Sequence, residues 1–411
     1  MVSSNEGRLE RMAADGTYEF AIVGRGMIGG AAARYLSKLS SSVAIFGEAE
    51  PMDQTSHDGS FASHYDSSRF YRVIDQYPHW ARMADRARSR YTELEEESGT
   101  TFHRPHPYLQ VSKHSAAALN EYGQLEAIGR DFGVESEILQ TSEQLNESFP
   151  KLQFPEGMIG QVESEKTAGV LNPRLFVEAE MTVARRQGAV TIPERVVAVE
   201  PGQGHVMVRT SSGNRYEAGK VLIAAGAWSH FLLQQPVQII LEAVAVALGE
   251  VPRTEAFAFP SLIYNRIPTD PAAQAGYLMS AVEYPDGKFY VKGGWYWSST
   301  VVETEAELNT FFRTEITRNI GKADRELFTG IVPGLRGVRS WSYKPCVHMR
   351  TPTHRPYIDE IEPDQVYVAF GGNGLAAKCA DEIGRLGAEL AASGSWRDDE
   401  LAADDFKVAY A

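Results

Sequence analysis

A glycine-rich turn near the N-terminus constrains the fold of this chain more than any other feature. The apolar run Tyr18–Gly24 predicts a short buried strand, and the run Ala31–Leu36 after the turn predicts a helix. The turn between them reads Gly24-Arg25-Gly26-Met27-Ile28-Gly29. Gly24 allows a tight turn, Gly26 lets the backbone approach a pyrophosphate, and Gly29 lets helix and strand pack closely. This pattern predicts a dinucleotide-binding unit; the alternative is a turn that binds nothing.

An acidic residue follows at the spacing that such a unit requires. The apolar run Val43–Phe46 ends at Gly47-Glu48, where a carboxylate can accept hydrogen bonds from a ribose. Arg25 is unusual inside the turn, and its side chain either points outward or adds a charge near the phosphates. The sequence leaves both possibilities open.

Two later segments repeat the order of apolar strand and glycine turn. The run Val221–Trp228 contains Gly226, and the run Val366–Gly374 ends in Gly371-Gly372-Asn373-Gly374. Such strands are typical of buried parallel sheet, and their glycines let backbone approach a ligand. We expect the three units to form one composite cofactor site.

Cys346 lies in an unusual setting. Lys344, His348 and Arg350 are all within four residues of it, and positive neighbours favour the nucleophilic thiolate. A thiolate beside an electrophilic cofactor can become its covalent attachment point. The alternative is a buried free thiol that packs as a small hydrophobic side chain.

Composition excludes some classes of partner. The formal net charge of −14 argues against nucleic acid or an anionic membrane surface. No apolar run is long enough to span a bilayer, and the N-terminal residues lack the apolar core of a signal peptide. Two cysteines without a disulfide framework fit a reducing cytoplasm. We expect a cytoplasmic protein with a disordered leader over residues 1–17.

Periodicity predicts further elements along the chain. The predicted helices and strands are a helix over 78–98, a strand over 107–111, a helix over 115–133, a capped helix start over 141–150, a helix from 173 to 186, strands over 196–199 and 206–209, and a helix over 376–392.

The motifs together resemble a known family. The segments GRGMIGG, LIAAGAWSHFLL, KPCVHMRTPTHRPYID and FGGNGLAAKCADEIGRLGAELA look like those of the FAD-dependent amine oxidases of the monomeric sarcosine oxidase and N-methyltryptophan oxidase group. The match runs in the right order over nearly the whole chain and is weakest over residues 236 to 335. It implies an α/β fold, with a Rossmann-like FAD-binding domain and an interleaved α+β substrate domain on an antiparallel sheet.

The resemblance also implies a domain division and a cofactor site. The FAD-binding domain would comprise residues 18–100, 155–235 and 336–411, and the substrate domain residues 101–154 and 236–335. Cys346 would form a thioether to a methyl group of the flavin. The implied cofactor-binding residues are Gly24, Gly26, Ile28, Gly29, Glu48, Ser68, Arg69, Val197, Gly226, Trp228, Cys346, Gly372, Asn373, Gly374 and Lys378.

Catalytic roles follow from the same resemblance. Arg69 would lie near the flavin ring, and Arg72 would hold a substrate carboxylate through its planar fork. Arg69 and Arg72 are three residues apart, which on a helix or turn would place both on one side. Both could instead be solvated surface arginines.

Two lysines complete the implied set. Lys378 is a second partner for the carboxylate, or an ordinary surface lysine. Lys292 matches the lysine that activates oxygen, where a positive charge stabilises the negative charge that develops on O₂. It could instead be an outward-facing lysine of a strand.

The chain departs from the family at three positions. Asn373 and Tyr296 stand where histidine is usual, and His348 stands where a tyrosine is usual. Sarcosine itself is therefore a poor guess for the substrate. No general base is needed beyond one that keeps the amine unprotonated, and His348 is a candidate because the pKa of a histidine can lie near neutrality. Aromatic residues are dense near Lys292 and Cys346, and any one of them is expected to pack in the core or on a sheet face. As a cluster they suggest a roomy apolar pocket for a bulkier amine or a cyclic imino acid, and they are Tyr284, Tyr290, Trp295, Tyr296, Trp297, Trp341 and Tyr343.

These inferences predict a monomeric flavin-dependent oxidase that acts on the C–N bond of a secondary or cyclic amino acid. Its partners would be this small molecule and molecular oxygen, with an imine and hydrogen peroxide as products, and we expect no metal site. The alternatives are an FAD-dependent dehydrogenase or hydroxy-acid oxidase, and a flavin-binding module without turnover.

Overall fold

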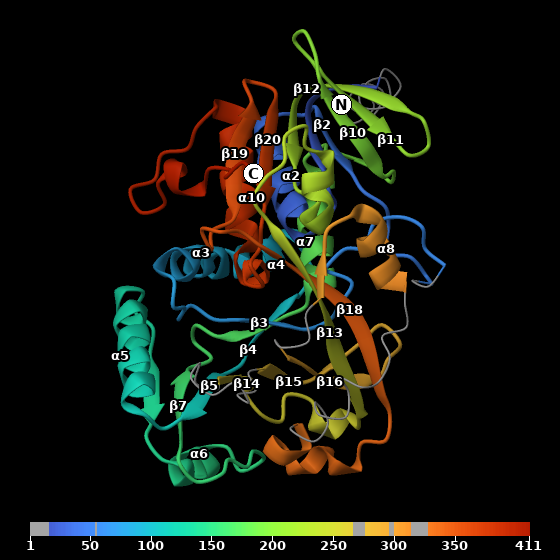
Figure 1. Cartoon of the computed structure of the whole chain (residues 1–411). Helices are drawn as coiled ribbons and strands as arrows, with labels where there is room; N and C mark the ends of the chain where they lie inside the picture. The colour runs from blue at the N-terminus through green and yellow to red at the C-terminus, as the bar shows by residue number, and fades with distance from the viewer. Residues whose placement is uncertain (1–15, 54–55, 266–275, 296–299, 314–327) are drawn as a thin grey trace.

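The computed structural model describes residues 16–53, 56–265, 276–295, 300–313 and 328–411. Most of the expected leader, with Tyr296 and Trp297, lies outside these residues. The described chain forms two stacked β-sheets with helices around them (Figure 1).

The first sheet is built on parallel strands that lie far apart in the sequence. β1 (Thr17–Val23) lies between β2 (Val43–Phe46) and β12 (Arg215–Ile223), and β12 also pairs in parallel with β20 (Val366–Phe370). The remaining strands extend its edges and are β9 (Val190–Ile192), β10 (Val196–Pro201), β11 (Val206–Thr210) and β19 (Tyr357–Glu362). Buried apolar runs such as β1 are typical of such a sheet.

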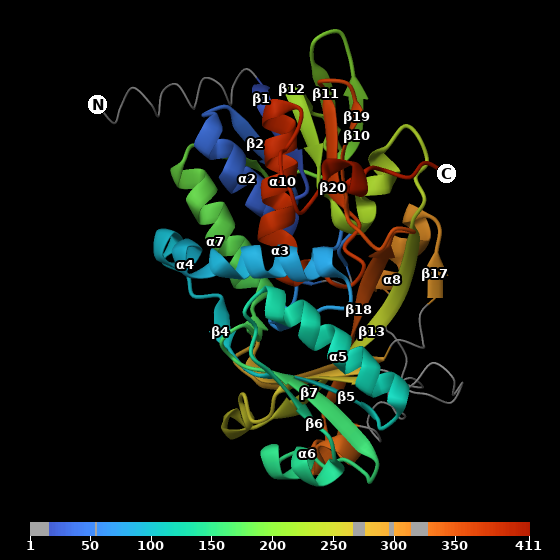
Figure 2. The same cartoon turned by 90° about the vertical axis from the view of Figure 1, so that its left-hand side faces the viewer.

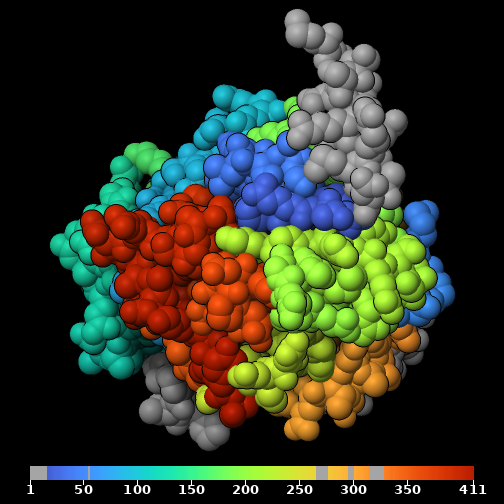
Figure 3. All heavy atoms as spheres, turned by 90° about the horizontal axis from the view of Figure 1, so that it is seen from above, coloured from blue at the N-terminus to red at the C-terminus, as the bar shows by residue number. Residues whose placement is uncertain are grey.

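Three helices pack beside this sheet. They are α2 (Met27–Leu39), α7 (Pro173–Arg186) and α10 (Ala380–Ser393), with the short turn η4 (Ala376–Cys379) before α10. Seen from above, segments from the beginning, the middle and the end of the chain lie side by side on one face (Figure 3).

The second sheet is antiparallel except where β5 pairs with β14. Its strands, in spatial order, are β17 (Thr300–Val302), β13 (Ile240–Val251), β16 (Phe289–Trp295), β15 (Gly276–Glu283), β14 (Ser261–Asn265), β5 (Tyr108–Lys113), β7 (Met158–Glu163) and β6 (Ser136–Leu139), with β18 (Trp341–Arg350) also on β13. A small sheet of β3 (Arg69–Tyr71), β4 (His103–Pro105) and β8 (Gly169–Leu171) lies between the two large ones (Figure 1). The predicted fold class is confirmed.

The sheet memberships refine the expected domain limits. β7 and β18 belong to the second sheet, although the division at residues 155 and 336 would place both in the FAD-binding domain. Each pairs along its length with a strand of that sheet, and these backbone hydrogen bonds fix its membership. The division into two domains itself stays a prediction.

The remaining helices follow local sequence signals. α5 (Ala116–Asp131) begins where the Ser115 hydroxyl accepts from the Ala118 N–H, and α6 (Ser142–Ser148) begins with a capping box at Thr141. The helix expected over 78–98 is two helices, α3 (Pro78–Ser89) and α4 (Tyr91–Ser98). The last named elements are α8 (Glu305–Arg313) and the short turns η1 (Gly226–Leu232), η2 (Arg253–Glu255), η3 (Pro333–Gly337) and η5 (Ala403–Phe406). Among the described residues no helix combines the length and apolarity needed to cross a bilayer.

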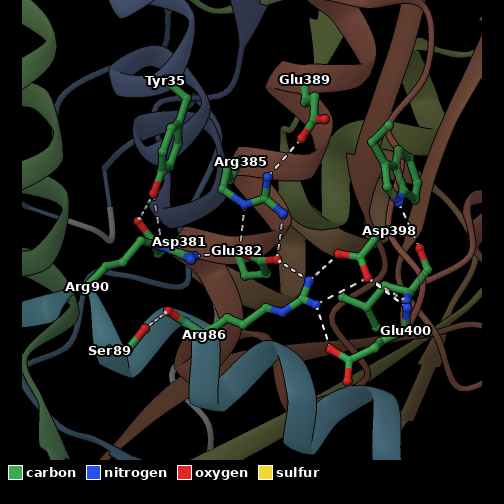
Figure 4. A network of polar contacts seen from close by, with 12 residues as sticks. Tyr35, Arg86, Ser89, Arg90, Asp381, Glu382, Arg385, Glu389, Asp398 and Glu400 are labelled. Carbon is green, nitrogen blue, oxygen red and sulfur yellow. Dashed lines mark hydrogen bonds and ion pairs between the residues drawn. The ribbon is translucent and has the colours of Figure 1, made fainter.

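A set of buried and half-buried charges, which we call the helix network, ties α2, α3 and α7 to α10. Figure 4 shows its part around Arg86, Asp381 and Glu382. Arg34 is 1% exposed and pairs with Glu180 at 2.5 Å and with Asp381. The network consists of Arg34, Arg86, Arg90, Arg385, Glu180, Asp381, Glu382 and Asp398. It contains none of the predicted site residues.

Candidate functional site

Residues from both large sheets line a single cavity of about 720 Å³. Of the predicted site residues, all but Gly29 and Ser68 contribute to its wall. One end lies at the first glycine turn, and the other lies beside β5 and α5 of the second sheet. The cavity is therefore long enough to bring a cofactor and a second ligand together.

The first glycine turn has the geometry that the sequence predicts. Gly24 has a φ of +113°, and a Cβ there would lie 2.4 Å from the Ala224 carbonyl oxygen. A Cβ on Gly29 would lie 1.8 Å from the carbonyl oxygen of Gly24, so Gly29 serves helix packing and not the cavity wall. Gly26 directly precedes α2, whose N-terminus faces the cavity and favours an anion.

Residues around this turn supply the polar and apolar walls of the same end. The Glu48 carboxylate lines the cavity and accepts a hydrogen bond from the Ser60 N–H at 3.0 Å. Val197 of β10 also lines the cavity, and so do Gly226 and Trp228 of the turn after β12. The Trp228 indole N–H donates to Asn309, which fixes the ring in the wall.

His64 is a residue that sequence reasoning missed. It lines the cavity near Gly26, and its Nδ1 atom is buried without a hydrogen-bond partner among the described residues. Burial, with the nearby Arg174 and Arg25, lowers the pKa of His64 to about 3. A neutral imidazole with an unpaired nitrogen, beside a turn that only glycine can form, fits a dinucleotide such as FAD.

Lys292 is buried and points into the cavity from β16. Its Nζ donates to the Asp66 carboxylate at 2.5 Å and to the Ser68 carbonyl at 2.6 Å, and the residue is 1% exposed. Burial and the positive charge of Arg69 lower the pKa of Lys292, whereas the carboxylate of Asp66 favours its charged form. The alternative of an outward-facing lysine is therefore wrong, because the strand turns this side chain inward.

Asp66, which the sequence analysis did not identify, organises this end of the cavity. Besides Lys292 it pairs with Arg69, and it accepts a hydrogen bond from the Tyr284 hydroxyl at 2.7 Å. Arg69 also donates to the carbonyls of Ser68 and Ser63. An acid two residues before the predicted Ser68-Arg69 pair was the available signal.

Arg72 and Lys378 meet at a second carboxylate, Asp75. Lys378 Nζ donates to Asp75 Oδ2 at 2.7 Å, and Arg72 lies 3.2 Å from the same oxygen. All three are at least 92% buried and line the cavity. Burial raises the pKa of Asp75, but Lys378 and Arg72 outweigh it and hold the pKa below its usual value.

The expectation that Arg69 and Arg72 lie on one side of a helix or turn is wrong. Arg69 begins the strand β3 and Arg72 directly follows it, so neither lies on a helix or turn. The two guanidinium groups reach the cavity at different carboxylates, Asp66 and Asp75. A strand pairs more favourably here because β8 offers it backbone partners.

β18 carries the predicted cofactor cysteine. Cys346 pairs with Val244 of β13 and is half-buried in the cavity wall, whereas Cys379 is a fully buried core thiol. Residues two apart on a strand share a face, which places Lys344 and His348 beside Cys346.

The near-neutral pKa expected for His348 is wrong. Burial and the neighbouring Arg350 lower the pKa of His348 to about 4. The imidazole is thus neutral at pH 7 and a weak base. The sequence showed the charged neighbours but not the burial, which is the larger effect.

The last glycine turn is held by Asn373. This residue adopts a φ of +50°, and its side-chain amide bonds to Thr351 and to the Gly371 carbonyl. Its amide therefore fixes the turn, together with Gly372 and Gly374, against the end of β18.

Most of the aromatic residues expected to form the pocket lie elsewhere. Of those in the described part of the chain, Tyr284, Tyr290, Trp341 and Tyr343 do not line the cavity. Trp341 stacks on Phe328 in a separate core, and the Tyr290 hydroxyl bonds to Asp286. The aromatic wall comes instead from Phe61, Phe70, Tyr77, Trp80, Trp228 and Tyr277.

Comparison with known proteins gives consistent matches over almost the whole chain. The family model described as FAD dependent oxidoreductase (DAO) matches residues 19–390. Human peroxisomal sarcosine oxidase is 24% identical over 387 residues, which cover 91% of this chain and 92% of that protein. N-methyl-L-tryptophan oxidase of Yersinia pestis (strain Pestoides F) is 24% identical over 388 residues, covering 91% and 95%.

A solved structure shares the fold. The open form of NikD, described as an unusual amino acid oxidase essential for nikkomycin biosynthesis, superimposes with a TM-score of 0.76. The two are 19% identical, and the alignment covers 96% of this chain and 98% of that one.

Proposed function

This chain belongs to the family of FAD-dependent oxidoreductases, and from that premise we propose that it is an oxidase acting on the C–N bond of a secondary or cyclic amino acid. The predicted family and the cofactor FAD are confirmed. The observation that carries the substrate class is the position of Arg72 and Lys378 in the same cavity as the dinucleotide turn and Lys292.

Arg72 and Lys378 bind the carboxylate of the substrate in this proposal. A guanidinium pairs with a carboxylate through two parallel hydrogen bonds, and the ammonium of Lys378 adds a third. Asp75 neutralises one of the two positive charges, so a net charge of about +1 remains. A monocarboxylate matches this charge, and a second carboxylate at the same place would be repelled.

The residues that would hold the cofactor are the glycine turns, Glu48 and Cys346. FAD, when bound, would accept a hydride from the C–H bond next to the amine nitrogen, and loss of the N–H proton would leave a C=N bond, the imine. Cys346 Sγ is the proposed point of covalent attachment, since it is the half-buried thiol of the cavity wall. The chain itself orients the substrate and excludes water.

Lys292 assists the oxygen half-reaction. A buried ammonium stabilises the negative charge that develops on oxygen during its reduction to peroxide. Asp66 holds Nζ in place and favours its protonated form. His348, neutral at pH 7, adds no competing positive charge beside Cys346.

The central test is anaerobic bleaching of the purified yellow protein by N-methyl, cyclic and aromatic amino acids, followed by readmission of air. We expect a secondary amino acid to bleach the flavin, and air to restore the colour quickly with release of peroxide. Bleaching with slow recovery would indicate a dehydrogenase instead. Absence of bleaching by every amine would overturn the proposal.

Covalent attachment has a separate test. After acid precipitation, the wild-type protein should retain its flavin in the pellet, whereas Cys346→Ser should release all of it. Cys379→Ser is the matched control, because Cys379 lies in the core and should leave attachment unchanged. Flavin that stays bound in Cys346→Ser would contradict the assignment.

A monomeric, cytoplasmic protein that binds no nucleic acid remains our prediction from composition and cysteine usage. Size-exclusion chromatography with light scattering tests the first part.

A further inference from the structure

Glu121 differs from Asp66 and Asp75, the two acidic residues of the cavity that pair with predicted site residues. Asp66 pairs with Lys292 and Arg69, and Asp75 pairs with Lys378 and Arg72. Glu121 lines the same cavity, is partly buried, and forms no ion pair with any residue that the structure describes.

One long hydrogen bond holds this carboxylate. Gln110 donates to Glu121 at 3.3 Å, which is the only side-chain bond that Glu121 makes within the described ranges. Burial raises the pKa of Glu121, and this hydrogen bond offsets only part of the effect. A carboxylate in a cavity wall without a protein cation is a typical site for a positive group of a ligand.

The position of Glu121 is fixed by α5. This helix lies along the second sheet next to β5 and β7 (Figure 2), where the Tyr122 hydroxyl donates to Ser112 at 2.9 Å and the Tyr122 carbonyl accepts from Gln161. Glu121 and Leu125, one turn apart, both line the cavity. The carboxylate therefore belongs to a rigid wall of the cavity.

A short series of contacts joins Glu121 to the proposed carboxylate site. The Arg72 guanidinium lies over the Tyr108 ring at 5.0 Å, and the Tyr108 hydroxyl donates to Gln110 at 3.3 Å. Gln110 in turn contacts Glu121. Only two side chains thus separate Arg72 from Glu121.

Glu121 lies away from the reacting end. Gln110 pairs with Ile263 of β14, and β14 and β15 stand between β5 and the strand of Lys292. Three strand spacings correspond to roughly 14 Å. A substrate held at Arg72 would direct its amine toward Lys292 and its side chain toward Glu121.

We propose that the substrate is an amino acid whose side chain ends in a basic nitrogen group, and that Glu121, with Gln110, selects it by binding that group. This inference rests on the proposed function. It makes Glu121 a specificity-determining residue, remote from the C–N bond that is oxidised.

The experiment compares two substrates of similar length, racemic Nα-methyl-lysine and racemic Nα-methyl-norleucine, on the flavin-loaded protein. We expect kcat/KM to favour Nα-methyl-lysine by about 10- to 100-fold, because the free energy of a hydrogen bond to a charged group corresponds to a ratio of this size. In Glu121→Gln the preference should fall to within about threefold of unity, mainly through a higher KM for Nα-methyl-lysine.

Two further variants separate recognition from folding. Glu126→Gln, on the same helix but outside the cavity wall, should keep the wild-type preference. Glu121→Lys should disfavour Nα-methyl-lysine and improve kcat/KM for racemic Nα-methyl-glutamate, which a general loss of structure would not do.

The outcomes distinguish this inference from the proposed function. Equal kcat/KM for the two substrates in the wild type, or an unchanged preference in Glu121→Gln, would overturn the role of Glu121 while N-methyl amino acid oxidation stands. Oxidation of other N-methyl amino acids but of neither of these two would do the same. Failure of every secondary amino acid to bleach the flavin would overturn both.

Discussion

The helix network and the charges of the cavity are two buried sets of ion pairs with different surroundings. In the network, Arg34 of α2 is buried against Glu180 of α7 and Asp381 of α10. In the cavity, Lys292 and Lys378 are buried as deeply, yet both also border an open volume. Burial and pairing alone therefore do not distinguish the two sets of charges; contact with a cavity marks the candidates for function.

The comparison predicts that charges in the network matter for stability. Arg34→Met leaves Glu180 and Asp381 buried without this partner, and we expect the free energy of unfolding to fall by about 3–5 kcal/mol. Urea denaturation measures the change. Arg82→Met, which removes a more exposed pair with Glu400, should cost less than about 1 kcal/mol. An equal loss in the free energy of unfolding in the two variants would show that burial does not increase the contribution of the network to stability.

Charges in the cavity should instead matter for the reaction. Lys292→Met should slow reoxidation of the reduced protein by oxygen about 10²- to 10³-fold, because the developing negative charge loses its buried partner. Stopped-flow mixing of anaerobically reduced protein with air-saturated buffer measures this rate. Lys288→Met, an exposed lysine paired with Glu250, is the control and should leave the rate unchanged. An unchanged reoxidation rate in Lys292→Met would show that this lysine does not assist the reaction with oxygen.

Substrate binding gives a smaller effect. Arg72→Lys keeps the charge but loses the planar fork, so we expect KM for a secondary amino acid to rise about 10-fold. Steady-state peroxide production measures it. Arg104→Lys, a surface change on β4, should leave KM as it is. An unchanged KM in Arg72→Lys would indicate that Lys378 alone binds the carboxylate.

We expect acid to lower the stability of the protein over two different pH ranges, one set by the cavity and one by the helix network. The pKa of His348 is lowered from 6.5 to about 4, so the unfolded state gains a proton first, and stability falls as pH drops from 6.5 to 4. Burial raises the pKa of Asp398, but Arg86 and two backbone N–H groups lower it to about 2. Its contribution is therefore lost between 3.8 and 2.

Urea midpoints measured across pH test these windows. His348→Phe should flatten the upper window, and Asp398→Asn should flatten the lower one. Loss of the same pH range in both variants would contradict the assignment of one range to His348 and the other to Asp398.

The local parts of the site were predictable from sequence. The turn at Gly24 and the capped start of α6 depend on neighbouring residues, and the sequence specifies them directly. The partners of the lysines were not predictable. Asp66 lies 226 residues from Lys292, and Asp75 lies 303 residues from Lys378. No local period relates such pairs, because the fold alone brings them together.

The helix network was missed for the same reason. Four of the aromatic residues expected around the pocket, Tyr284, Tyr290, Trp341 and Tyr343, lie outside its wall. Aromatic density along β16 and β18 says nothing about which face of the sheet borders the cavity. The faces are set by the register of β13 with its neighbours, which only the structure shows.

The order of strands in the first sheet has a consequence for biosynthesis. Val23 pairs with Ile223, and Ile223 pairs with Val368, so the walls of the dinucleotide turn are translated at widely separated times. A nascent chain that ends before β20 leaves Val221, Leu222 and Ile223 of β12 without their partners on one edge. Capture of the cofactor must therefore wait until almost the whole polypeptide has left the ribosome, and the emerging N-terminal third depends on protection from aggregation until then.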